Sequence, residues 1–215
     1  MIKAVIFDLE GTLVDFQWKL TEGEGELRKA LEGFGFEPDL FSGDNYAQIW
    51  NKVIEIAPPE ALQKIKDCLS EIYDRYDQDA LSRWSLKPGA QEILLLLYKQ
   101  GVKIGLVTNV GEKAAREVLF RFNLTRFFHQ IITRNDTKFM KPRGEGIELC
   151  IADLGVGKEH TLFIGDSLSD IFAAKEAGIK VAIVKGGESS MEEILAASPD
   201  YFLDSMQNIP PTQQL

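Results

Sequence analysis

Short apolar runs recur along the chain, and each is bounded by turn-forming or charged residues. Besides two weaker runs at 130–133 and 201–203, the clear ones are residues 3–7, 103–107, 161–165 and 181–184. Runs this short with little polar alternation are typical of strands buried on both faces of a sheet. Helical periodicity fills the segments between them, over residues 90–99, 112–122, 146–154, 169–177 and 191–197. The alternation predicts the α/β class, with a Rossmann-like parallel sheet and right-handed crossovers.

Between residues 15 and 87 the strand pattern is absent, and apolar residues recur at helical spacing, as at Leu27 and Leu31. We therefore predict two domains: a catalytic core of residues 1–14 and 88–215, and a helical cap of residues 15–87. An insert directly after the first strand lies over the carboxyl end of the sheet, where ligands of open α/β folds bind. We expect the cap to act as a lid.

The composition is that of a globular protein, with 45% hydrophobic residues and a net charge of −9. No apolar stretch approaches the ~20 residues needed to span a bilayer, and the absence of a basic stripe argues against a nucleic-acid partner. Cys68 and Cys150 share no redox or metal-binding spacing, and the chain starts in a strand-like run without a leader. We therefore expect a cytoplasmic protein. The sequence leaves open whether it is a monomer or a homodimer, and residues 210–215 are expected to fray.

Acidic residues follow the first predicted strand, where Asp8 and Glu10 precede Gly11 and Thr12. A carboxylate can attack phosphorus and form an aspartyl-phosphate, which makes Asp8 a candidate nucleophile. Glu10 would protonate the leaving oxygen and later deprotonate the attacking water. For these residues taken alone, a polar turn without chemistry is the alternative.

A second acidic turn, with Asp166, Ser167 and Asp170, follows the third clear apolar run. Carboxylates gathered from two strand ends repel one another unless a cation or a phosphoryl-transfer reaction uses them. We predict a divalent cation bound by Asp8, Asp166 and Asp170, the last directly or through water, with Glu10 contributing its backbone carbonyl. Ser167 and Asp170 also match a capping box, which is an ordinary start of a helix.

Three further residues form a candidate phosphate cradle. Thr108 and Asn109 close the second strand shortly before a helix, where a hydroxyl and backbone N–H groups favour an anion. Lys141, in a loop before Pro142, would neutralise charge that develops on a phosphoryl group. With Gly11 these residues are the candidate phosphate ligands, and Thr108 and Lys141 are also candidate catalytic residues. Alternatively, Thr108 caps a helix and Lys141 is a solvated loop residue.

Together these elements resemble the motifs of the haloacid dehalogenase superfamily over essentially the full length of the chain. The residues that match its four motifs in order are Asp8, Glu10 and Thr12, then Thr108, then Lys141, and finally Asp166 and Asp170. The predicted cap resembles the helical C1-type cap of the phosphoglycolate phosphatase-like branch. Glu10 departs from the usual Asp, but the enolase-phosphatase branch is similar in carrying Glu there.

The resemblance implies a Mg²⁺-dependent phosphomonoester hydrolase that acts on a small phosphorylated metabolite through an aspartyl-phosphate intermediate. Three alternatives remain: a phosphomutase of the same fold, a 2-haloacid dehalogenase, and a non-catalytic protein that binds a phosphorylated ligand. An acid at position 10 favours phosphate over halide, because the family's dehalogenases carry a non-acid there. Specificity is expected to lie in the cap, where the residues that could face the cleft are Trp18, Lys19, Arg28, Arg75, Tyr76 and Trp84.

Overall fold

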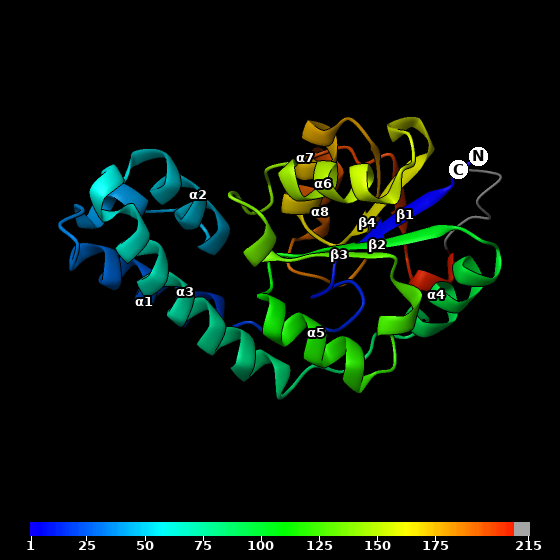
Figure 1. Cartoon of the computed structure of the whole chain (residues 1–215), viewed down its shortest axis with the longest axis horizontal. Coiled ribbons are helices and arrows are strands. Elements are labelled where there is room, and N and C mark those ends of the chain that lie inside the picture. Colours follow the sequence, from blue (N-terminus) through cyan, green and yellow to red (C-terminus); the bar gives the residue numbers. More distant parts are fainter. Residues whose placement is uncertain (209–215) are drawn as a thin grey trace.

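The computed structural model describes residues 1–208, so the expected fraying of the tail concerns residues outside the described part of the chain. A sheet of six parallel strands has the order β3-β2-β1-β4-β5-β6 (Figure 1). The strands are β1 (Ala4–Phe7), β2 (Lys103–Val107), β3 (Gln130–Ile132), β4 (Thr161–Gly165), β5 (Lys180–Val184) and β6 (Tyr201–Leu203). The predicted α/β fold with a parallel sheet is therefore confirmed, including both of the weaker strands.

Helices cover both faces of the sheet, with α6, α7 and α8 above the strands and α4 and α5 below them in Figure 1. Their bounds are α4 (Ala90–Lys99), α5 (Glu112–Arg121), α6 (Glu145–Leu154), α7 (Leu168–Ala177) and α8 (Met191–Ala196). Short 3-10 helices are η1 (Pro38–Phe41), η2 (Thr125–Phe127), η3 (Arg134–Asp136), η4 (Lys158–His160) and η5 (Met206–Asn208).

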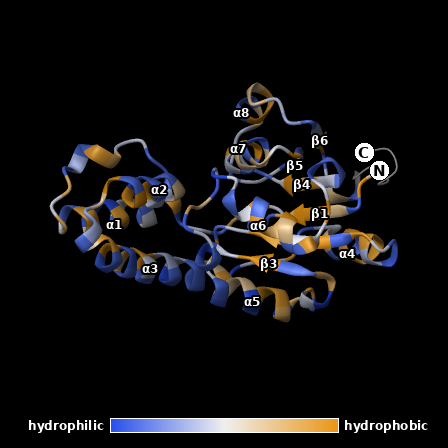
Figure 2. Cartoon of the chain, turned by 45° about the horizontal axis from the view of Figure 1, so that its top comes forward, coloured by the Kyte–Doolittle hydropathy of each residue, from blue (hydrophilic) through white to orange (hydrophobic). Residues whose placement is uncertain are grey.

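The central strands are mostly apolar because each of their faces packs on a separate core. In β1, Val5 and Phe7 belong to one hydrophobic cluster, while Ala4 and Ile6 belong to the other. Since neighbouring residues of a strand point to opposite faces, both sets must be hydrophobic. Figure 2 shows this as hydrophobic colour along the central strands, whereas α3 is largely hydrophilic.

Three helices make up most of the predicted cap segment: α1 (Leu20–Glu32), α2 (Tyr46–Ile56) and α3 (Pro59–Leu81). They lie to one side of the sheet in Figure 1. The two linkers to this segment run side by side, because Val14 and Leu86 form an antiparallel bridge and the Asp15 N–H donates to the Ser85 carbonyl at 3.0 Å. The division into a core and a cap at these linkers stays a prediction. None of the helices within residues 1–208 is long and apolar enough to cross a membrane.

The register of the sheet brings three strand ends together. Phe7 at the end of β1 pairs with Leu106 of β2 on one side and with Ile164 of β4 on the other. The residues that follow these three strands therefore leave the sheet at the same edge. That edge carries Asp8, Thr108 and Asp166.

Candidate active site

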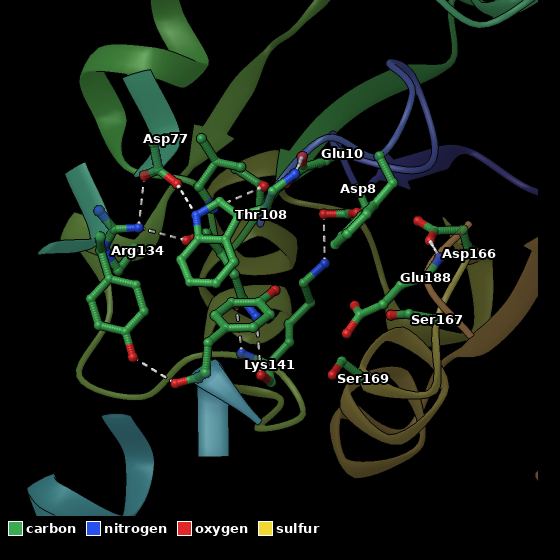
Figure 3. Close-up of a pocket in the computed structure, with 16 residues that line it drawn as sticks. Asp8, Glu10, Asp77, Thr108, Arg134, Lys141, Asp166, Ser167, Ser169 and Glu188 are labelled. Atoms are coloured by element: carbon green, nitrogen blue, oxygen red, sulfur yellow. Dashed lines mark hydrogen bonds and ion pairs between the residues drawn. The ribbon is translucent and has the colours of Figure 1, made fainter. Parts of the chain in front are cut away.

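A buried lysine connects two of the predicted acidic residues. The Lys141 ammonium donates to Asp8 Oδ1 at 2.6 Å (Figure 3). It also donates to Asp170 Oδ1 at 2.6 Å. The exposed fractions are 5% for Lys141, 6% for Asp8 and 0% for Asp170. Burial lowers the pKa of Lys141, but the two carboxylates outweigh it and the pKa is raised overall. The lysine therefore carries a fixed positive charge beside the candidate nucleophile.

Asp166 lies against the turn that follows β1. Its Oδ1 accepts from the Thr12 hydroxyl at 2.7 Å, and its Oδ2 accepts from the Glu188 N–H at 2.9 Å. Gly11 has φ +83°, and a Cβ there would lie 2.3 Å from Asp166 Oδ2. Glycine is needed at this position both for its backbone conformation and for the close approach of the carboxylate.

Asp170 caps a helix, as one of the two interpretations of the sequence had it, and it also contacts Lys141. Its Oδ2 accepts from the N–H groups of Asp166 and Ser167 at 3.0 Å and from the Ser167 hydroxyl at 2.8 Å. These contacts complete the capping box at the start of α7. Its Oδ1 accepts from Lys141, so the residue that completes the capping box of α7 also contacts the lysine.

Asp8, Asp166 and Asp170 form a triad that suits a metal ion. One carboxylate oxygen from each lies within 4.8 Å of the other two. Burial and the neighbouring carboxylate Asp170 raise the pKa of Asp8 to about 6 and raise that of Asp166 as well. Hard oxygen donors that repel one another fit Mg²⁺ or a similar cation. Repulsion at this site would fall once a cation is bound.

Thr108 and Asn109 also line the cavity that contains Asp8 and Lys141. The Thr108 hydroxyl accepts from the Val110 N–H at 3.2 Å. The Asn109 side chain bonds the backbone of Lys141 twice, accepting from its N–H at 2.9 Å and donating to its carbonyl at 3.1 Å. Gly11 is not part of the cavity lining, and its N–H donates to the Val14 carbonyl at 2.8 Å.

Glu10 reaches the cavity and is also bound to both linkers of the cap segment. Its Oε1 accepts from the N–H groups of Gln17 and Trp18 at 2.8 Å and from the Trp84 indole at 2.9 Å. Burial raises the pKa of Glu10 to about 7 despite these hydrogen bonds. A carboxyl group with such a pKa can donate or accept a proton near neutral pH. The position of Glu10 depends on the linkers that connect cap and core.

At the other end of the cavity a second buried cation, Arg134, pairs with Asp77 of α3 (Figure 3). Asp77 Oδ2 accepts from Arg134 Nη1 at 2.9 Å and from the Gly111 N–H at 2.8 Å, and Asp77 Oδ1 accepts from the Trp18 indole at 3.2 Å. Arg134 also donates to the Asn109 carbonyl at 3.0 Å. Both charges are thus satisfied by partners within the protein.

Several lining residues were missed by the sequence analysis, namely Tyr46, Tyr73, Asp77, Arg134, Ser169 and Glu188. Arg134 and Glu188 follow the ends of β3 and β5. Thr108 was selected because it follows a predicted strand, and the same criterion would have selected these two residues. The tyrosines and Asp77 lie in cap helices and belong to no recognisable motif.

Among the six cap residues expected to face the cleft, Trp18 alone lines the cavity. The other five are not among its lining residues, and each bonds another residue of the protein. Lys19 pairs with Asp79, and Arg28 bonds Glu24 and two backbone carbonyls. Arg75 and Tyr76 bond Glu26, and Trp84 bonds Glu10.

The cavity is closed around these groups. It offers about 20 Å³ of space to water-sized spheres, which is room for roughly one water molecule. A phosphorylated metabolite needs more space than this arrangement offers.

Comparisons with known proteins agree with this geometry. Residues 5–184 match the haloacid dehalogenase-like hydrolase family. A phosphoglycolate phosphatase from Photorhabdus laumondii is 28% identical over 97% of this chain and 91% of its own. The pyrophosphatase PpaX of Oceanobacillus iheyensis is 24% identical over 97% of this chain and 95% of its own. The crystal structure of a HAD-superfamily hydrolase, subfamily IA, from Geobacter sulfurreducens superposes with a TM-score of 0.60, at 24% identity and with 96% and 97% of the two chains covered.

The match spans most of the chain, and it includes the buried lysine and the carboxylates that resemble the motifs of this family. The protein belongs to the haloacid dehalogenase-like hydrolases. It is therefore an enzyme of the hydrolase class.

Proposed function

We propose that the protein is a Mg²⁺-dependent phosphomonoester hydrolase that acts on a small phosphorylated metabolite through an aspartyl-phosphate intermediate. The observation that carries the proposal is the Lys141 ammonium 2.6 Å from the buried Asp8 carboxylate, which belongs to a triad of acids that could hold a metal ion. The proposal assigns Asp8 as the nucleophile, Lys141 as the cation for the phosphoryl oxygens and the triad as the site of the divalent ion. Relatives named as a phosphoglycolate phosphatase and a pyrophosphatase support the reaction class.

In the first step, an Asp8 carboxylate oxygen attacks the phosphorus atom while the bond from phosphorus to the leaving oxygen breaks. Glu10 gives its proton to that oxygen, so the alcohol leaves as a neutral molecule. In the second step, Glu10 takes a proton from water, whose oxygen attacks phosphorus. The bond from phosphorus to Asp8 then breaks, and inorganic phosphate and the free carboxylate are regenerated.

Lys141, the Thr108 hydroxyl and the Asn109 N–H would hold the phosphoryl oxygens in both steps. We assign Asp8, Asp166 and Asp170 as side-chain ligands of Mg²⁺, with the backbone carbonyl of Glu10 as a further ligand. The bound cation would offset the repulsion between the incoming phosphate and the Asp8 carboxylate.

The closed cavity supports a small substrate and a cap that opens to admit it. Aromatic side chains of Trp18, Tyr46 and Tyr73 contribute to the wall at the cap side. They would pack against the leaving group, whereas the core residues hold its phosphate. We keep a cytoplasmic location and the absence of nucleic-acid and membrane partners as predictions of the sequence, and leave monomer and homodimer open.

The proposal is tested by phosphate release from p-nitrophenyl phosphate and from a panel of sugar phosphates, phosphoglycolate and pyrophosphate. We expect turnover with Mg²⁺, loss of turnover after chelation, and recovery when Mg²⁺ is added back. Asp8→Asn should abolish turnover, whereas Asp39→Asn, at an exposed site on the cap segment, should leave it unchanged. Wild-type activity in Asp8→Asn would exclude Asp8 as the nucleophile.

The same panel separates the alternatives. A rearranged sugar phosphate without free phosphate would identify a phosphomutase. Metal-independent release of halide from a 2-haloacid would identify a dehalogenase. Ligand binding without turnover across the panel would indicate a binding protein.

A further inference from the structure

The loop that carries Lys141 is bound by a residue of the cap. Asn51 of α2 is buried, and its side-chain amide bonds both backbone groups of Met140. Its Oδ1 accepts from the Met140 N–H at 2.8 Å, and its Nδ2 donates to the Met140 carbonyl at 2.9 Å. This contact recognises the backbone, so it is independent of the side chain at position 140.

The next residue of the loop is bound in the same way from the core. Asn109 accepts from the Lys141 N–H and donates to the Lys141 carbonyl. Two successive residues are therefore each held by a side-chain amide, one from the cap and one from the core. Only the contact made by Asn109 can persist when the cap moves away from the core.

The rest of the loop shows the same division. Glu145 of the core accepts from the N–H groups of Lys138 and Phe139 at 3.1 and 2.8 Å. Trp50 of the cap donates its indole N–H to the Lys138 carbonyl at 3.0 Å. The cap thus contacts this loop through two neighbouring residues of α2, and both contacts are directed at the backbone.

We propose that Asn51 is a positioning residue that makes the placement of Lys141 depend on closure of the cap. This inference rests on the proposed function, in which Lys141 binds the phosphoryl group. A substrate enters only when the cap opens, which separates Asn51 from Met140 and leaves the loop held by the core alone. Closure restores both hydrogen bonds and sets the Lys141 backbone. A displacement of about 1 Å at a catalytic group can cost on the order of 100-fold in rate.

The test compares two substitutions of Asn51 with a matched control on the same helix. Asn51→Leu removes both hydrogen bonds at similar volume, and Asn51→Asp keeps the shape but sets a carboxylate oxygen against the Met140 carbonyl. Glu55→Gln changes an exposed residue one turn further along α2. We expect both Asn51 variants to lower kcat for p-nitrophenyl phosphate about tenfold, from the loss of two hydrogen bonds worth about 1 kcal/mol each less partial compensation. Glu55→Gln should match the wild type.

A double-mutant cycle separates positioning of Lys141 from simple docking of the cap. The ligand is orthovanadate with Mg²⁺, and its dissociation constant is measured for the wild type, Asn51→Leu, Lys141→Ala and the double variant. We expect Asn51→Leu to weaken binding about tenfold when Lys141 is present and less than about twofold in Lys141→Ala, because coupled residues are not additive. The proposal would be overturned if Asn51→Leu weakened vanadate binding equally with and without the Lys141 side chain, or in neither case.

Hydrogen exchange of the peptide that contains residues 138–141 gives a readout that needs no activity. Exchange at Met140 should rise in Asn51→Leu and Asn51→Asp and stay unchanged in Glu55→Gln. Unchanged exchange in all three variants would also contradict the proposal. If the wild type bound no vanadate and hydrolysed no ester, the proposed function would fail instead, while the exchange data would still report on the contact.

Discussion

The two ends of the cavity both bury a cation between two carboxylates, but the carboxylates come from different parts of the molecule. Lys141 pairs with Asp8 and Asp170, which belong to the sheet and to α7. Arg134 pairs with Asp77 and Asp74, which both lie on α3 of the cap segment. The ion pairs of Lys141 lie outside the predicted cap segment, whereas those of Arg134 connect α3 of that segment to η3.

This difference indicates that the Lys141 ion pairs serve the proposed reaction, whereas the Arg134 ion pairs hold α3 in place. Asp8 belongs to the triad that suits a metal ion, and its raised pKa reflects burial and the neighbouring carboxylate Asp170. Both carboxylate oxygens of Asp77 already accept hydrogen bonds, Oδ2 from Arg134 and Gly111 and Oδ1 from Trp18. A buried ion pair is therefore not by itself a sign of catalysis. The role of each ion pair is indicated by the part of the chain that supplies its carboxylates.

The largest effect should follow from removing the cation of the core pair. Lys141→Ala leaves Asp8 and Asp170 without their common partner and removes a charge that would stabilise the phosphoryl group. We expect kcat for p-nitrophenyl phosphate to fall on the order of 1000-fold. The control is Lys138→Ala, an exposed lysine of the same loop, which should change kcat less than about twofold. Comparable losses in both variants would show that the loop, and not the Lys141 ammonium, matters.

The cap pair should affect stability more than chemistry. Asp77→Asn removes the charge that compensates the buried Arg134, and we expect it to lower the free energy of unfolding by about 3 kcal/mol. Asp74→Asn removes the other partner of the same guanidinium, but the Asp74 side chain is 60% exposed. Its loss should therefore cost less than about 1 kcal/mol. Urea unfolding of the two variants measures the difference, and equal costs would refute the role given to burial.

The two ends also differ in how far the sequence predicts them. Asp8, Thr108 and Asp166 directly follow buried strands, and the parallel sheet brings such positions to one edge whatever the details of packing. For that reason the sequence was sufficient to predict the fold and the end of the cavity that contains Asp8. The sequence offered Asp170 either as a helix-capping residue or as a cation ligand, and it did not predict the contact with Lys141, because a capping box looks the same in the sequence with or without a lysine on its second oxygen.

The end of the cavity that contains Arg134 and Asp77 depends on how the helices of the predicted cap segment pack on the rest of the chain. Asn51, Tyr73 and Asp77 sit on amphipathic helices, and the sequence does not reveal which face of each helix meets the core. Arg75 and Tyr76 were expected at the cleft for their chemistry, yet they are one or two residues from Asp77 and point to a different side of α3. Helical geometry makes such neighbours diverge by about 100° per residue.

A smaller effect should follow from loosening Glu10, which lies between the two ends. Trp84→Phe removes one of the three donors to the Glu10 carboxylate and keeps most of the aromatic volume. We expect kcat to fall about fivefold, because a single hydrogen bond contributes about 1 kcal/mol. The KM for p-nitrophenyl phosphate should change little, since the cradle around Lys141 is unaffected. A change confined to KM would mean that Trp84 acts on substrate binding rather than through Glu10.

The smallest effect should come from Arg75, which sets the lower limit of the comparison. Its guanidinium pairs with Glu26 at 2.6 Å within the cap segment, but the two side chains are 58% and 38% exposed. A solvated ion pair that does not reach the cavity contributes little, so Arg75→Ala should lower the free energy of unfolding by no more than about 0.5 kcal/mol. Its kcat and KM on every substrate of the panel should equal those of the wild type. If Arg75→Ala lost activity on a single substrate of the panel, Arg75 would have to contact that substrate. The substrate-bound cap would then differ in arrangement from the one described.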